Sequence, residues 1–149
     1  MGRLRCVFFI LLALVAFPVA ATAQLQGGLE RSGDAEQGFR LGQNYPNPFN
    51  PDTRIPFELY ENAFPDGQPA TVTIRIYNIL QHYIASPTAL NHASGEGTEV
   101  VNLEYGFPGR YEAYWDGRNR AGQRAPSGVY VLEMSVNGRP QILRMFLSN

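Results

Sequence analysis

The sequence predicts an all-β protein, a two-sheet antiparallel β-sandwich of about seven strands. Short segments in which apolar and polar residues alternate recur along the chain, and glycine, proline, asparagine and aspartate residues separate them. Downstream of the N-terminal apolar stretch, no segment repeats its apolar residues at helical spacing. Together these observations are typical of a sandwich in which each strand turns one face to the core.

The N-terminus has the three parts of a secretory signal peptide. Two arginines precede an apolar run, Val7–Phe17, and the small residues Ala21 and Ala23 mark a cleavage site before Gln24. The apolar run is shorter than the roughly 20 residues that a membrane-spanning helix needs. We therefore expect residues 1–23 to be removed during export to the periplasm, cell surface or medium, with no transmembrane segment left.

The rest of the chain is expected to form a short leader and one domain. Residues 24–40 are polar and glycine-rich, which predicts a flexible leader, and residues 41–149 are long enough for one hydrophobic core. Cys6 is the single cysteine, so no disulfide is expected in the mature chain. Once Arg3 and Arg5 are removed, acidic residues outnumber arginines, a balance that excludes typical nucleic-acid binding.

A proline-rich segment, Asn44–Pro51, opens the expected domain. Its three prolines lack backbone N–H donors and push the preceding residues into extended geometry, so no helix passes through it. The asparagines between them are suited to bonding nearby backbone groups and shaping turns. We expect a polyproline-like or turn-rich ribbon made by Asn44, Pro46, Asn47, Pro48, Phe49, Asn50 and Pro51.

The next two expected strands show strict alternation. In residues 54–59 every second residue is apolar, from Ile55 to Leu59, and Pro56 within this run predicts a strand at a sheet edge. Residues 71–76 alternate most clearly and predict a central strand. The expected buried residues of these two strands are Ile55, Phe57, Leu59, Val72, Ile74 and Ile76.

Two shorter strands are expected in the middle of the chain. Residues 83–85 follow residues 71–76 closely enough to return as a hairpin partner. The apolar residues 100–103 come after a glycine-rich loop, residues 91–97, and predict another short strand.

The last third of the chain contains three expected strands. Tyr111, Ala113 and Trp115 alternate inward before a long turn that starts at Asp116-Gly117. Asn137-Gly138 predicts a tight hairpin, because a type I′ turn needs positive φ at both central residues. The first strand of this hairpin is expected to bury Tyr130, Leu132, Met134 and Val136. The returning strand, residues 141–147, is expected to bury Leu143, Met145 and Leu147.

Three segments together resemble a bacterial immunoglobulin-like module. They read GQNYPNPFNPDTRIPFEL at residues 42–59, VTIRIYNIL at residues 72–80 and YWDGRNRAGQRAPSGVYVLEM at residues 114–134. This combination is similar to the module shared by the flagellar hook-capping protein and the C-terminal sorting domains of the type IX (Por) secretion system. The resemblance spans residues 41–149 and implies an Ig-like or fibronectin-III-like sandwich.

The resemblance also implies roles for individual residues. Trp115 matches the family's core tryptophan, and Arg144 supplies a positive charge near the C-terminus, where the family carries lysines. Sorting domains are read by a secretion and attachment machinery, so the implied partner is that machinery or a cell-surface protein. Besides the proline-rich segment, the matching positions are Tyr77, Trp115, Asp116, Gly117, Gly122, Ser127, Gly128, Tyr130 and Arg144.

No catalytic or metal-binding constellation is evident in the sequence. The loop after Asp116 superficially resembles a calcium loop, but Arg118 and Arg120 occupy positions where oxygen ligands are needed. His82 and His92 are the only histidines, and no cysteine remains to complete a tetrahedral zinc site. We therefore expect a protein that is not an enzyme and has no metal or cofactor.

Two alternative functions stay open at this stage. A structural assembly module like that of the hook cap fits the fold but not the signal peptide, since flagellar components resemble type III export substrates. A carbohydrate-binding module would need an exposed row of aromatic side chains, whereas aromatic residues more often fill the core. The candidates for such a row are Tyr60, Tyr105, Phe107, Tyr111, Tyr114 and Tyr130.

Overall fold

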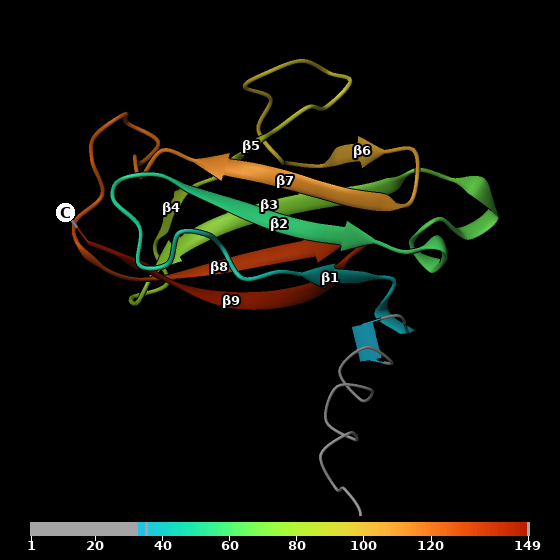
Figure 1. Ribbon diagram of the computed structural model, residues 1–149, viewed down its shortest axis with the longest axis horizontal. Coiled ribbons are helices and arrows are strands. Elements are labelled where there is room, and N and C mark those ends of the chain that lie inside the picture. Colours follow the sequence, from blue (N-terminus) through green and yellow to red (C-terminus); the bar gives the residue numbers. More distant parts are fainter. Residues whose placement is uncertain (1–32, 35, 149) are drawn as a thin grey trace, which may run out of the picture.

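The computed structural model describes residues 33, 34 and 36–148. In this part of the chain, nine β-strands form two antiparallel sheets that pack face to face (Figure 1). The predicted all-β sandwich is therefore confirmed. The predicted signal peptide, with its cleavage residues Ala21, Ala23 and Gln24, and most of the predicted leader lie outside the described residues.

The first sheet has the strand order β1-β2-β7-β5. Its members are β1 (Phe39–Leu41), β2 (Thr53–Leu59), β7 (Gly109–Trp115) and β5 (Thr88–Ala89). The two long strands pair along their whole length, with Thr53 opposite Trp115 and Leu59 opposite Gly109. The short strands cover the two sides of this central pair.

The second sheet has the order β4-β3-β8-β9, and β6 also pairs with β3. Its members are β3 (Ala70–Asn78), β4 (Tyr83–Ala85), β6 (Leu103–Tyr105), β8 (Gly128–Val136) and β9 (Arg139–Leu147). Strand β3 has partners on both sides, as predicted for a central strand. Two 3-10 turns, η1 (Glu61–Ala63) and η2 (Pro65–Gly67), lie between β2 and β3.

The core lies between the inner faces of the two sheets. The alternation predicted its members correctly in β2, β3 and β8, and Met145 and Leu147 of β9 are also buried, while Leu143 is half-buried against the core. Aromatic rings occupy both ends of the core. One cluster consists of Phe49, Trp115 and Tyr130, and the other of Phe57, Tyr105 and Tyr111.

The prediction that Pro56 marks an edge strand is wrong, because β1 pairs with the outer side of β2. Pro56 lies opposite Gly42, one residue beyond the end of β1, and its carbonyl accepts the Gly42 N–H at 2.8 Å. The missing proline donor therefore falls where the β1 ladder has already ended, so no strand pairing is lost.

Two predicted boundaries also need correction. Phe39 and Arg40, assigned to the leader, belong to β1, and Phe39 is fully buried in the core. The strand predicted over residues 100–103 begins only at Leu103. Val100 instead bridges the two sheets, because its N–H donates to the Pro87 carbonyl at 2.9 Å and its carbonyl accepts the Ile74 N–H at 2.8 Å.

The hairpin between β8 and β9 forms at the predicted turn. Asn137 and Gly138 have φ of 49° and 82°, the left-handed values that a type I′ turn requires. Asn137 also connects the turn to β3 and η1, because its Oδ1 accepts the Thr71 N–H at 2.9 Å and its Nδ2 donates to the Ala63 carbonyl at 2.7 Å.

The positive φ of Gly138 makes a direct prediction about stability. We expect Gly138→Ala to lower the free energy of unfolding by about 1 kcal/mol, because a side chain disfavours the left-handed region. Gly106→Ala is the matched control, since a Cβ there meets nothing within 4 Å and the backbone is not left-handed. Equal urea midpoints for both variants would contradict this reading of the turn.

Candidate functional site

The proline-rich segment lies against the end of the last strand. Phe49 N–H donates to the Phe146 carbonyl at 2.9 Å, and Ser148 N–H donates to the Phe49 carbonyl at 2.9 Å. The Asn47 side chain accepts the Phe146 N–H at 2.9 Å. The outer edge of β9, on the side away from β8, is therefore paired at Phe146 by Phe49 and by Asn47, which is 99 positions earlier in the chain.

The Phe49 ring enters the core and completes one of its aromatic clusters. It is buried and lies 5.5 Å from the Trp115 ring, which is in turn 5.4 Å from the Tyr130 ring in an edge-to-face arrangement. Trp115 Nε1 donates to the Arg118 carbonyl at 2.9 Å, and the Tyr130 hydroxyl donates to the Pro126 carbonyl at 2.6 Å. Both polar tips thus hold the loop between β7 and β8 over this end of the sandwich.

Asn44 fixes the turn at the start of the proline-rich segment. Its side chain is buried, and Nδ2 donates to the Pro46 carbonyl at 3.2 Å and to Thr53 Oγ1 at 3.0 Å. Thr53 Oγ1 donates to the same Pro46 carbonyl at 3.0 Å. This is the backbone bonding expected of the asparagines in the segment.

The Trp-Asp-Gly part of the motif touches the proline-rich segment directly. Gly117 is buried with φ of 73°, and a Cβ at this position would lie 2.3 Å from the Pro51 carbonyl oxygen. Asp116 Oδ1 accepts the Arg118 N–H at 3.0 Å and so turns the chain after β7. Two motif halves that are distant in sequence therefore meet at one end of the sandwich.

The structure does not bring every motif residue to this contact. Pro46, Pro48 and Asn50 are exposed, as are Gly122 and Ser127 in the loop before β8 and Gly128 at the start of that strand. Tyr77 and Arg144 lie on the outer face of the second sheet, where Val131 is the cross-strand partner of both. The motif thus divides into a structural set around Phe49 and an exposed set.

Two glutamines extend the connection between the first residues of the domain and β9. Gln141 Oε1 accepts the Leu41 N–H at 2.7 Å, and Gln141 Nε2 donates to the Phe39 carbonyl at 3.1 Å. Gln43 Nε2 donates to the Arg144 carbonyl at 3.5 Å. These residues were not predicted, although Gln141 at an inward position of a strand was a visible irregularity.

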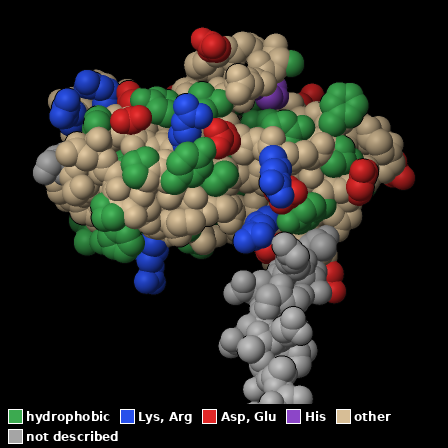
Figure 2. Space-filling model, viewed as in Figure 1, with side chains coloured by type: hydrophobic (Ala, Val, Ile, Leu, Met, Phe, Trp, Pro, Cys, Tyr) green, Lys and Arg blue, Asp and Glu red, His purple; other side chains and the backbone are tan. Residues whose placement is uncertain are grey.

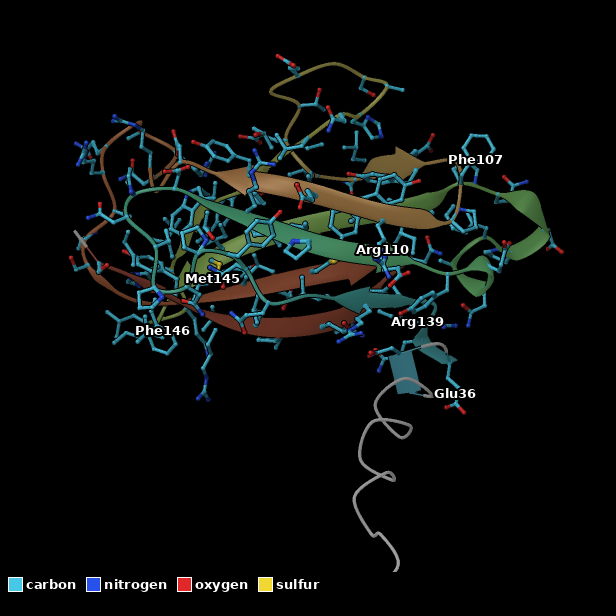
Figure 3. The ribbon with its side chains drawn as sticks, viewed as in Figure 1. Glu36, Phe107, Arg110, Arg139, Met145 and Phe146 are labelled. Carbon is cyan, nitrogen blue, oxygen red and sulfur yellow. The ribbon has the colours of Figure 1, made fainter. Side chains whose placement is uncertain are left out.

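A pocket of about 660 Å³ lies on the outer face of the first sheet, beside the labelled Arg110 in Figure 3. Its charged lining residues Arg110 and Glu58 face each other at 3.5 Å, and Glu112 pairs with Arg54 at 3.1 Å. The Tyr45 hydroxyl also donates to Glu112, which raises the pKa of Tyr45. The charges therefore satisfy one another across the strands.

Most of the aromatic residues considered for carbohydrate binding are inside the molecule or at its edge. Tyr105 and Tyr130 are buried and Tyr111 is half-buried, and burial raises the pKa of all three phenols. Phe107 is 77% exposed, but the other five candidates form no exposed row with it. The arrangement agrees with the preference of aromatic residues for the core.

Neither a metal-binding cluster nor a membrane-spanning helix occurs within residues 33, 34 and 36–148. Among them, no group of three or more histidine, cysteine, aspartate or glutamate side chains is placed to hold a metal ion. His92 instead lies with its Nε2 2.9 Å from the Glu104 carbonyl and its ring against Tyr105. Within the same residues, no helix has the length and hydrophobicity needed to cross a bilayer.

Comparison with known sequences gives no relative, since no family model and no curated protein matches the chain. Regions of several solved structures are similar to this chain, among them the following three. Latent PorU of Porphyromonas gingivalis matches with a TM-score of 0.48 and 18% identity, covering 73% of this chain and 9% of PorU. PorZ, described as a surface component of the type IX secretion system of the same species, matches with a TM-score of 0.43 and 19% identity, covering 79% of this chain and 13% of PorZ.

The third similar structure comes from a different class of protein. The alkylpurine DNA glycosylase AlkC of Pseudomonas fluorescens, bound to DNA, matches with a TM-score of 0.46 and 16% identity, covering 75% of this chain and 31% of AlkC. The chain thus spans less than a third of each of these proteins. At these identities, the similarity concerns the fold alone.

Burial of the Phe49 ring predicts a large effect of its removal. We expect Phe49→Ala to lower the free energy of unfolding by about 3 to 5 kcal/mol, because a cavity would open beside Trp115. Phe107→Ala removes the same ring from an exposed site and should change the value by less than about 0.5 kcal/mol. Chemical denaturation measures both, and a small loss for Phe49→Ala would show that the segment is not part of the core.

The contact between Gly117 and Pro51 can be separated from backbone strain by a second glycine. Gly117 and Gly122 have φ of 73° and 77°, but only Gly117 would place a Cβ against another backbone. We expect Gly122→Ala to cost about 1 kcal/mol and Gly117→Ala about 1 to 3 kcal/mol more. If thermal denaturation gives equal losses for the two variants, the close approach to Pro51 is not tight.

Proposed function

We propose that this chain is an exported, non-enzymatic β-sandwich module that is read by a surface-sorting or attachment machinery, as the C-terminal sorting domains of type IX secretion are. The predicted signal peptide supports export, and the three segments that resemble sorting domains support the role. Because the charged side chains around the pocket on the first sheet are paired with one another, they are better suited to holding strands together than to catalysis.

The observation that carries the proposal is the bonding of Asn47 and Phe49 to the end of β9. The residues of the motif around Phe49 serve to hold the last strand in place, and the exposed residue Arg144 lies on that strand. In the family that the sequence resembles, positive charge near the C-terminus accompanies recognition. A motif that fixes β9 therefore fixes the surface that the machinery would read.

The outward side of β9 is suited to recognition by another protein. Its side chains Ile142, Arg144 and Phe146 are exposed, and Arg144 forms no ion pair among the described residues. An unpaired guanidinium beside apolar side chains provides both charge and contact area, a combination enriched in protein interfaces. Recognition of this surface requires no change in the sandwich.

The proposal predicts where the protein is found in a type IX-secreting bacterium. Expressed there with its own N-terminus, the chain should start at Gln24 by intact mass and be accessible to antibody on the cell surface. An isogenic strain without the outer-membrane translocon should retain it in the periplasm. Recovery from the cytoplasm alone, or the same distribution in both strains, would refute the proposal.

A matched pair of variants tests whether β9 is the part that is read. Arg144→Gln and Arg139→Gln each remove one exposed charge from β9, the first in its second half and the other at its first residue. We expect Arg144→Gln to lower the surface fraction severalfold and Arg139→Gln to leave it unchanged, with the melting temperature unaltered in both. Equal surface fractions for Arg144→Gln and the unchanged chain would remove β9 from the proposal.

A further inference from the structure

The turn between β3 and β4 exposes two large apolar side chains. Ile79 is 71% and Leu80 69% exposed. The turn does not need them for its shape, because Asn78 Oδ1 accepts the N–H groups of Leu80 at 3.0 Å and His82 at 2.9 Å. The side chain of Asn78 therefore holds the shape of the turn, and the two hydrophobic residues at the tip of the turn are exposed to solvent.

These two residues belong to a larger apolar patch on the outer face of the second sheet. Val129 and Phe146 are cross-strand partners and both are exposed, and the Tyr77 and Tyr83 rings lie 6.0 Å apart. Ile79 directly follows Asn78, whose cross-strand partner Tyr130 is next to Val129 in β8. We name this surface the apolar patch; it consists of Tyr77, Ile79, Leu80, Tyr83, Val129 and Phe146.

Arginines surround the apolar patch. The Arg120 guanidinium lies 5.3 Å from the centre of the Tyr83 ring, and the Arg120 N–H donates to the Ile84 carbonyl of β4. Arg144 is next to the patch on β9, and Arg75 is two residues before Tyr77 on β3. Arg118 and Arg124 come from the same loop as Arg120, their backbones form an isolated antiparallel β-bridge, and Arg118 pairs with Asp116 at 3.7 Å.

The charge of this surface is opposite to that of the rest of the molecule. The outer face of the second sheet and the loop after β7 carry five arginines and three acidic residues, Glu104, Asp116 and Glu133. The remaining described residues carry four arginines and nine acidic residues. In Figure 2, blue and green side chains gather at the left end, where Figure 1 places the loop after β7 and the turn between β3 and β4.

We propose that the apolar patch and its arginines form a docking surface for a lipid bilayer with anionic phosphate headgroups. A protruding apolar tip is suited to entering the boundary between headgroups and acyl chains. Arginine binds phosphate with two parallel hydrogen bonds, and basic residues near a membrane surface strengthen binding electrostatically. This proposal goes beyond the sorting role and does not rest on it.

Vesicle binding tests the proposal with the processed chain purified from the periplasm of an expression host. We expect it to sediment with phosphatidylcholine vesicles containing about one third phosphatidylglycerol, and hardly at all with pure phosphatidylcholine. Binding should weaken as salt rises from about 0.1 M to about 0.5 M, because salt screens the charges. Absence of binding, or equal binding to both vesicles, would overturn the proposal. It would also be overturned if the surface bound an acidic protein and did not bind anionic vesicles.

Two sets of variants locate the surface. The double variant Ile79→Ser, Leu80→Ser should bind anionic vesicles at least about tenfold more weakly, through loss of the apolar tip. Removing two arginines with Arg120→Gln and Arg124→Gln should cost about 10- to 30-fold, whereas Arg110→Gln with Arg139→Gln should have little effect at the same net charge. Figure 3 shows Arg110 and Arg139 far along the sandwich from Phe146. Equal losses for the two arginine pairs would overturn the assignment.

Insertion has its own readout that does not depend on affinity. Leu80→Trp should show fluorescence quenching by nitroxide-labelled lipids in anionic vesicles, and Phe107→Trp, an equally exposed position elsewhere, should not. The natural Trp115 is buried and supplies a constant background in both variants. Quenching of both positions, or of neither, would contradict docking through the turn between β3 and β4.

Discussion

Closure of the outer edge of β9 by Phe49 is the interaction on which the rest of the arrangement depends. A nine-residue edge strand offers a row of free backbone groups to any other strand. Here Pro140 has no N–H to offer, and the Gln43 side chain donates to the Arg144 carbonyl. Phe49 donates to the carbonyl of Phe146, and Asn47 accepts its N–H. The same ring that anchors the segment also fills the core, so edge protection and core packing are achieved together.

Asparagine side chains order most of the turns that surround this core. Asn44, Asn78, Asn119 and Asn137 each form two or more hydrogen bonds with the side chain, most of them with backbone groups. A turn held by its own asparagine needs no hydrophobic anchor. Its outward positions are then available for other residues, and the apolar pair Ile79 and Leu80 occupies such positions.

The sequence was sufficient to predict the long strands but not their neighbours. Residues of β2, β3 and β8 alternate because one face is fully buried, so the pattern reveals both strand and face. Strand β1 has only three residues and gives no such pattern, which is why Pro56 pointed wrongly to an edge. The contact of Phe49 with β9 rests on backbone groups, and these carry no signature in the side chains.

The pairing of Phe49 with β9 also sets the order in which the chain becomes foldable. Asn47, near the start of the domain, bonds to Phe146 of β9, which is 99 positions later in the chain. The sandwich therefore lacks one edge and part of its core until β9 is present. Contacts between such distant residues slow folding, because a long loop must close first. A chain that emerges from its N-terminus, from a ribosome or through a membrane, therefore cannot complete this sandwich until β9 has emerged.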